Sequence, residues 1–182
     1  MSLICCRNPY DRLVSAYIDK SLKEDGIYIK TFHSPCQWLT LHQHFQNFTL
    51  TFKQFVTCVL FNAKSESKKS QKRLNATKSL DLSARVAGIR LDQHWAPQYH
   101  LSRPCDTRYT LIGKHEHFAD DLSASIRLLK LNATVESKEK ATSNKYPLSY
   151  WYNQLDSSMI SDLQELYRLD FEMFGYNATP PL

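Results

Sequence analysis

Two short apolar runs, each leading directly into a helical pattern, constrain the fold of this chain most strongly. The first run (LICC, residues 3–6) precedes a helical apolar pattern from residue 10 to about residue 23. The second (YTLIG, residues 109–113) precedes another, whose apolar face has four expected inward residues: Phe118, Leu122, Ile126 and Leu129. Strands that alternate with helices favour an α/β fold with a parallel sheet flanked by helices.

Two further segments have the helical apolar period. Residues 50–61 (LTFKQFVTCVLF) predict a buried helix. The last helix is predicted to begin at Ser157 or Ser158 as its cap and to end at Gly175. Its apolar stripe is formed by Ile160, Leu163, Tyr167, Phe171 and Phe174. With 182 residues and 42% hydrophobic content, the chain is expected to form one domain over residues 1–182.

A basic, polar stretch at residues 64–79 is predicted to be a solvated loop inserted into this domain. Its positive charges account for much of the formal net charge of +5 and are carried by Lys64, Lys68, Lys69, Lys72, Arg73 and Lys78. Anionic partners are therefore favoured. The stretch has no interleaved aromatic residues and no nucleic-acid-binding motif accompanies it, so nucleic acid is not the expected partner.

Cysteines and glycosylation sequons bear on the compartment. The sequons are Asn47, Asn75, Asn132 and Asn177, and four in so short a chain indicate the secretory lumen. An odd number of cysteines, five, leaves at least one thiol without an internal bridge, and Cys36 with Cys105 is one candidate pair among those that the sequence leaves open. No apolar run is long enough for a membrane span, and six residues before Arg7 are too few for a signal peptide. We therefore expect the native N-terminus to be missing.

The first strand-to-helix junction holds residues suited to an anion. A strand that ends in Arg7, a tight turn and a helix that presents Ser15 two turns later bring together a guanidinium, a hydroxyl and free helix amides. Such a corner suits a phosphate dianion. The alternative is that Arg7 forms a surface ion pair and Ser15 is simply exposed.

The full string RNPYDRLVSAYIDK (residues 7–20) resembles a known motif. It is similar to the 3′-phosphate-binding motif of sulfotransferases that use 3′-phosphoadenosine 5′-phosphosulfate (PAPS), in the form found in Golgi carbohydrate sulfotransferases of the chondroitin, dermatan, GalNAc-4 and HNK-1 group. In that motif the first Arg and the Ser eight residues later bind the 3′-phosphate, which here are Arg7 and Ser15. FKQFV with DQHWAPQ, then PCDTRYTLIGKHE and LYRLDFEMFGY, agree in order. The resemblance spans residues 4–176.

The resemblance implies a carbohydrate sulfotransferase that transfers sulfate from PAPS to a glycan hydroxyl. It also implies a P-loop-like fold, no metal, a glycoprotein, and a lumenal position at the Golgi membrane through an N-terminal anchor that this chain does not contain. The chain departs from the family in two ways: Ser102 stands near a position where relatives have a second Cys, and the 5′-phosphosulfate motif is absent. We therefore expect a truncated C-terminal portion that binds the donor nucleotide weakly and does not turn over. The alternative is a non-catalytic remnant that binds an anionic glycan or a protein partner.

Other residues near these motifs are open to two interpretations. His94 in HWAPQ is the candidate general base, since neutral imidazole accepts a proton near pH 7, or it satisfies a backbone carbonyl. Trp95 is either a sugar-stacking residue or part of the core. Lys114 and Glu116 follow a strand end, where ligands collect in α/β folds, or are solvated charges. The histidine pairs lack a carboxylate or cysteine at ligand spacing, so no metal site is predicted from them: His42 with His44, and His115 with His117.

Overall fold

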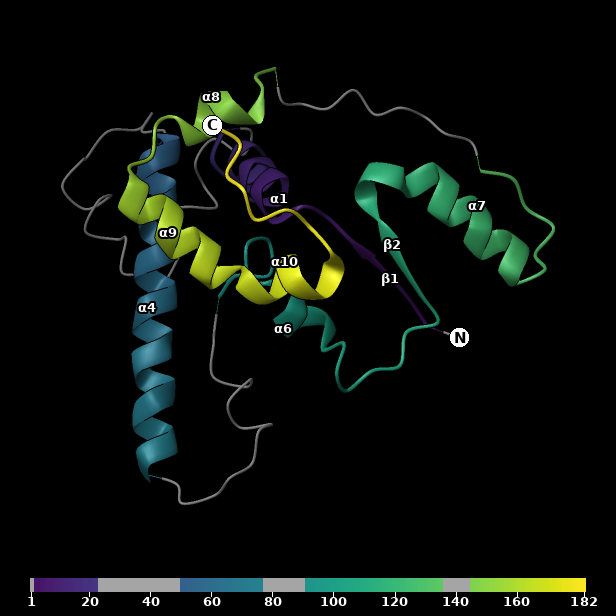
Figure 1. Ribbon diagram of the computed structural model, residues 1–182, viewed down its shortest axis with the longest axis horizontal. Helices are drawn as coiled ribbons and strands as arrows, with labels where there is room; N and C mark the ends of the chain where they lie inside the picture. The colour runs from purple at the N-terminus through teal and green to yellow at the C-terminus, as the bar shows by residue number, and fades with distance from the viewer. Residues whose placement is uncertain (1, 23–49, 77–90, 136–144) are drawn as a thin grey trace.

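The computed structural model of the protein describes residues 2–22, 50–76, 91–135 and 145–182, with residues 66–76 described as backbone only. Two strands, β1 (Leu3–Cys6) and β2 (Leu111–Lys114), pair in parallel. Leu3 lies opposite Leu111 and Cys6 opposite Lys114. Figure 1 shows this strand pair between α7 on one side and the remaining helices on the other. The predicted strand-then-helix alternation and the parallel pairing are confirmed.

The helices of the described segments follow the chain in this order: α1 (Pro9–Tyr17), a π-helical turn η1 (Ile18–Leu22), α4 (Phe52–Ala76), α6 (Gln98–Ser102), a 3₁₀ turn η2 (His115–His117), α7 (Phe118–Leu128), α8 (Leu148–Tyr152), α9 (Ser157–Leu166) and α10 (Arg168–Phe174). None of the described helices is long and apolar enough to cross a membrane. That residues 1–182 form a single domain stays a prediction.

The turn between β1 and α1 is set by local side chains. Pro9 occupies the first helical turn, where its missing N–H costs nothing. Asn8 caps the helix, because its side-chain Oδ1 accepts a hydrogen bond of 2.9 Å from the Tyr10 amide. α1 proper ends at Tyr17 and the π-helical turn continues to Leu22, so the expected helix is present with a change of winding.

An aromatic core joins α1, α4 and α8. The ring of Tyr17 lies 5.4 Å from those of Phe52 and Trp151, each in an edge-on orientation. Tyr10 packs edge-on against Tyr152 with ring centroids 5.0 Å apart. Edge-on aromatic pairs stabilise a core beyond the area they bury. The predicted buried helix at residues 50–61 is thus confirmed from Phe52 onward, as the N-terminal part of α4.

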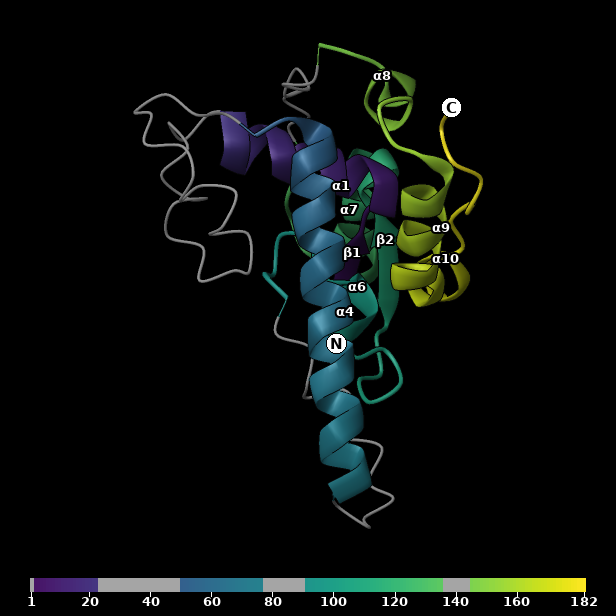
Figure 2. The same cartoon turned by 90° about the vertical axis from the view of Figure 1, so that its left-hand side faces the viewer.

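The predicted loop at residues 64–79 is wrong over residues 64–76, because α4 continues as helix to Ala76. The two views in Figures 1 and 2 show this part of α4 extending beyond the other described elements. Lys, Arg, Gln, Glu and Ala are good helix formers, and a solvated helix has the same polar composition as a solvated loop. Residues 77–79 lie outside the described residues.

The predicted inward face of α7 is also wrong. Phe118 is 51% exposed and Leu129, which follows the helix, is 45% exposed, whereas Leu122 and Ile126 are partly exposed. The buried residue of this helix is Ser125. The polar side faces the strand because the Asp121 carboxylate accepts a 2.6 Å hydrogen bond from the Lys114 amide. β1 is likewise less buried than expected, since only Cys6 of its four residues is fully covered.

The last predicted helix is two helices, α9 and α10, that meet at Tyr167. The expected apolar stripe is confirmed, because all five of its residues are buried. The cap is not a serine: Asp156 precedes α9 and its Oδ1 accepts a 3.0 Å hydrogen bond from the Met159 amide. Asp and Ser serve equally well as caps, so the sequence alone does not discriminate between adjacent positions. Gly175 ends α10, as expected, with φ of 63°.

We expect Gly175→Ala to lower the free energy of unfolding by about 1 kcal/mol, because a Cβ disfavours the left-handed conformation. The added Cβ would meet only the Lys114 Nζ, at 3.8 Å, so the cost is conformational and not steric crowding. Gly175→Asn is the matched variant, since asparagine tolerates this conformation and should cost less. Urea denaturation followed by circular dichroism measures the free energy of unfolding of both variants. Equal losses would contradict the view that the left-handed conformation at residue 175 is what alanine disfavours.

Candidate functional site

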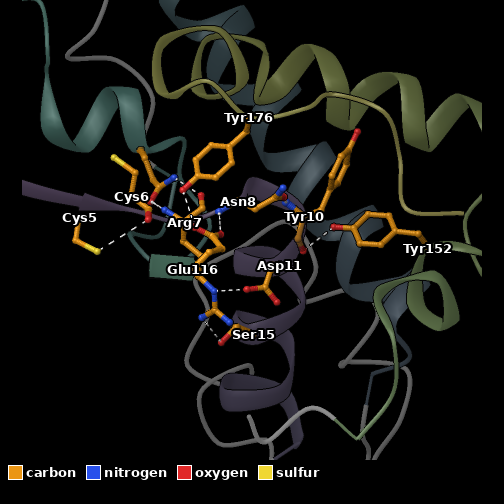
Figure 3. Close-up of polar contacts among 11 residues, drawn as sticks. Cys5, Cys6, Arg7, Asn8, Tyr10, Asp11, Ser15, Glu116, Tyr152 and Tyr176 are labelled. Atoms are coloured by element: carbon orange, nitrogen blue, oxygen red, sulfur yellow. Dashed lines mark hydrogen bonds and ion pairs between the residues drawn. The ribbon is translucent and has the colours of Figure 1, made fainter. Parts of the chain in front are cut away.

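The structure brings Arg7 and Ser15 together. Nη1 of Arg7, at the end of β1, donates a 3.1 Å hydrogen bond to Oγ of Ser15, on the second turn of α1. Figure 3 shows the guanidinium lying along one side of α1 next to the Ser15 hydroxyl. Both residues are half-buried. The predicted juxtaposition is present, and that the pair binds a phosphate stays a prediction.

Asp11 completes this group of charged and polar residues. Its Oδ2 pairs with Nε of Arg7, and the two side chains are 30% and 24% exposed, respectively. The expected alternative, in which Arg7 forms an ion pair, therefore holds together with the juxtaposition to Ser15. Sequence reasoning did not select Asp11, which lies in the first turn of α1 where acidic side chains are common.

Two amides at the start of α1 already have partners within the protein, so fewer of them are free than expected. The Asn8 amide donates 2.8 Å to Oε1 of Glu116, and the Tyr10 amide is bonded to the Asn8 side chain. Pro9 has no N–H. Glu116 thus places a carboxylate at the positive end of the helix. The contacts seen at the candidate site are made by the side chains of Arg7, Asp11 and Ser15.

Lys114 and Glu116 join β2 to the segment that follows α10. Oε2 of Glu116 accepts a 3.0 Å hydrogen bond from the Tyr176 hydroxyl, and Nζ of Lys114 donates 3.0 Å to the Gly175 carbonyl and lies 4.6 Å from the Tyr176 ring centroid. Desolvation, and then the neighbouring Glu116 carboxylate, raise the pKa of Tyr176. Neither charge is simply solvated, and the structure gives them a role in packing.

Gln98 clamps the backbone of Arg7 from the other side. Its Nε2 donates 2.7 Å to the Arg7 carbonyl, and its Oε1 accepts 3.0 Å from the Arg7 amide. The Gln98 and Tyr99 amides in turn each donate 2.7 Å to the carboxylate of Asp170, which is fully buried. Desolvation raises the pKa of Asp170, while these two amides and Arg12 oppose that shift. Asp170 therefore fixes α6, and α6 fixes the strand end that carries Arg7.

Arg12 holds the segment that contains HWAPQ. Its Nη1 donates 2.5 Å to the Ala96 carbonyl and its Nη2 donates 2.6 Å to the Gln93 carbonyl. Burial lowers the pKa of Arg12. Trp95 between them is 3% exposed, packs 5.3 Å from Phe55, and belongs to the core, so the sugar-stacking alternative is wrong. Arg12 therefore ties this segment to the helix that carries Ser15.

His94, the candidate base, is oriented by Asp92. Its Nδ1 lies 2.6 Å from Oδ1 of Asp92, and the His94 amide donates 2.8 Å to the same oxygen. A neutral imidazole that donates from Nδ1 has its lone pair on Nε2. The side chain is 31% exposed. The arrangement suits proton acceptance, and the catalytic role stays a prediction.

Of the remaining sequence predictions, the Cys36–Cys105 bridge is wrong, because Cys105 is a free thiol. Cys36 lies outside the described residues, whereas Cys58 is disulfide-bonded.

Asn132 and Asn177 are exposed, as glycosylation sites must be. Asn47 and the side chain of Asn75 lie outside the described part of the structure. His42 and His44 also lie outside it, and in the described segments no three His, Cys, Asp or Glu residues are placed to hold a metal.

Comparison with known proteins agrees with these motifs. The sulfotransferase family model matches residues 1–177. Similar curated proteins include carbohydrate sulfotransferase 11 of Rattus norvegicus (24% identity over 98% of this chain and 47% of the relative) and carbohydrate sulfotransferase 12 of Xenopus laevis (25%, 93% and 38%). Carbohydrate sulfotransferase 14 of Danio rerio is 31% identical over 48% of this chain and 25% of the relative. No solved structure gives a significant match.

The chain spans less than half the length of these relatives. The family model nevertheless covers almost all of it, including β1, α1 and both closing helices. The resemblance carried by residues 7–20 is confirmed, and this chain belongs to the sulfotransferase family.

Proposed function

We propose that the whole protein transfers sulfate from PAPS to a glycan hydroxyl and that, in this chain, Arg7 and Ser15 bind the 3′-phosphate of this donor. The observation that carries the proposal is the 3.1 Å contact between Nη1 of Arg7 and Oγ of Ser15. A guanidinium offers several donors in one plane, and a hydroxyl offers one more. A phosphate placed against both would receive charge-assisted hydrogen bonds from two sides.

The proposed transfer also needs a base, and His94 is the candidate for this role. In an in-line displacement, the acceptor oxygen bonds to sulfur while the bond from sulfur to the 5′-phosphate oxygen breaks, and a base takes the hydroxyl proton. We assign the base role to His94, with Asp92 orienting its imidazole. Binding of the 3′-phosphate by Arg7 and Ser15 positions the donor and does not touch the reacting atoms.

The relatives and the sequons support the proposed acceptor class and compartment. The relatives are named carbohydrate sulfotransferases, which supports a glycan acceptor. Asn132 and Asn177 are exposed within Asn-X-Thr sequons, which fits glycosylation in the secretory lumen. We therefore propose that the protein works on the lumenal side of the Golgi membrane.

Calorimetric titration with 3′-phosphoadenosine 5′-phosphate (PAP) and with adenosine 5′-phosphate tests the donor site. The unaltered chain should bind PAP more tightly, because only PAP carries the 3′-phosphate. Arg7→Ala should weaken PAP binding about 10- to 100-fold, since it removes hydrogen bonds to a charged group. Ser15→Ala should weaken it about 3- to 10-fold, in line with the loss of one hydrogen bond.

Arg168→Ala is the matched control. Arg168 lies on α10, is exposed, and pairs with Glu172 at 3.1 Å, so its removal takes away the same charge without removing any contact of Arg7 or Ser15. It should leave PAP binding unchanged. Equal affinities of the unaltered chain for PAP and adenosine 5′-phosphate, or an undiminished affinity of Arg7→Ala for PAP, would refute the proposal.

A further inference from the structure

We propose that Asp11 is a positioning residue that holds the Arg7 guanidinium in the orientation that binds the 3′-phosphate. The inference rests on the proposed function of Arg7 and Ser15 and adds a residue that contacts neither the donor nor the acceptor. It starts from the ion pair between Oδ2 of Asp11 and Nε of Arg7.

Arg7, Asp11 and Ser15 lie on one side of α1. Asp11 and Ser15 are one helical turn apart on α1, and Arg7, which precedes the helix, reaches both with its side chain. Figure 3 shows the guanidinium between the Asp11 carboxylate and the Ser15 hydroxyl, with a contact to each. Two different nitrogens of the same guanidinium are therefore used by two residues of one helix.

The nitrogens of Arg7 that Asp11 and Ser15 use decide which guanidinium N–H groups remain for a ligand. A guanidinium binds an anion side-on, through Nε and one Nη, or end-on, through both Nη atoms. Asp11 occupies Nε and so blocks the side-on mode. The end-on mode directs the anion to the Nη atoms, one of which is bonded to Ser15. Asp11 thus directs a phosphate towards the position where the Ser15 hydroxyl also reaches it.

Asp11 has a second, opposite effect, because its carboxylate repels a phosphate on the same guanidinium. The two side chains are 30% and 24% exposed, so solvent screens this repulsion. An arginine without a partner samples many rotamers, and that freedom is lost when it binds an anion. We infer that orientation outweighs repulsion and that Asp11 strengthens donor binding.

The test compares Asp11→Ala and Asp11→Asn with the unaltered chain by titration with PAP and adenosine 5′-phosphate. Asp11→Ala should weaken PAP binding about 3- to 10-fold, in line with the lost orientation of one long side chain. Its affinity for adenosine 5′-phosphate should not change. Asp11→Asn retains a carbonyl oxygen for Nε and should keep most of the PAP affinity.

A spectroscopic measurement reports the orientation directly. In ¹⁵N-labelled protein, the Nε–H proton of Arg7, assigned by its loss in Arg7→Ala, should exchange slowly in the unaltered chain. It should exchange faster in Asp11→Ala. The matched control is Asp120→Ala, which removes an exposed carboxylate from the first turn of α7 and should change neither measurement.

The outcomes separate the two proposals. If the unaltered chain does not distinguish PAP from adenosine 5′-phosphate, the proposed function fails and this inference fails with it. If PAP is preferred and Arg7→Ala removes the preference, the donor site stands. In that case, PAP affinity in Asp11→Ala that is unchanged or higher overturns the positioning role alone.

Discussion

Asp170→Ala is expected to lower the free energy of unfolding by about 3–5 kcal/mol, which is the largest effect of a single substitution predicted for this chain. The Asp170 carboxylate is fully buried and accepts hydrogen bonds of 2.7 Å from the Gln98 and Tyr99 amides. Alanine would leave both amides without an acceptor and would remove a negative charge near the partly buried guanidinium of Arg12. Each such loss destabilises the folded state separately.

Glu172→Ala, on the same helix, is the control that shows how much of the effect is due to the burial of Asp170. Glu172 is exposed and pairs with Arg168, so its removal should cost less than about 0.5 kcal/mol. The loss for Asp170→Asn should lie between those of the other two variants, because its one carboxamide oxygen can replace only one of the two carboxylate oxygens that accept from the amides. Chemical denaturation gives all three values. A loss for Asp170→Ala as small as that for Glu172→Ala would show that the two amide bonds contribute nothing.

Arg12→Met is expected to lower the free energy of unfolding by about 2–4 kcal/mol and to speed amide exchange near residues 93–96. Methionine keeps much of the length and apolar surface of the side chain but has no donor for the Gln93 and Ala96 carbonyls. Hydrogen bonds from a charged donor are stronger than neutral ones, and both would be lost together. Hydrogen–deuterium exchange with mass spectrometry, together with chemical denaturation, measures the two effects.

Arg127→Met provides the control for this change. Arg127 is exposed in the last turn of α7, so the same substitution should alter stability by less than about 0.5 kcal/mol. Arg12→Lys should recover only part of the loss, because an ammonium group lacks the two-pronged shape that reaches both carbonyls. Unchanged exchange at residues 93–96 in Arg12→Met would mean that another contact holds this segment.

These substitutions share a structural basis, since α1 organises both parts of the candidate site. One side of the helix carries Ser15 and Asp11 next to Arg7, whereas Arg12 reaches the segment with His94. The proposed donor-binding residues and the candidate base are thus attached to a single helix. Catalytic groups that must be held within a fraction of an ångström benefit from such placement.

What the sequence by itself determined is mostly local. The apolar period from residue 10 predicts α1 correctly, and the structure adds that Asn8 is its cap. The strand-turn-helix order places Arg7 just before α1 and Ser15 on its second turn, which makes the observed contact between them possible. The Gly175 stop and the buried stripe of the last helices follow in the same way from local rules.

Only the tertiary structure decided which distant groups meet and which polar segments form helices. Asp170 lies more than seventy residues along the chain from the two amides that donate hydrogen bonds to it. Gln98 lies ninety-one residues from Arg7, whose backbone it binds. Polar composition did not distinguish a loop from the extension of α4, nor did periodicity show that Asp121 and not Phe118 would face the strand. The physical reason is that local backbone preferences depend on neighbouring residues, whereas burial and long-range hydrogen bonds depend on how the elements pack.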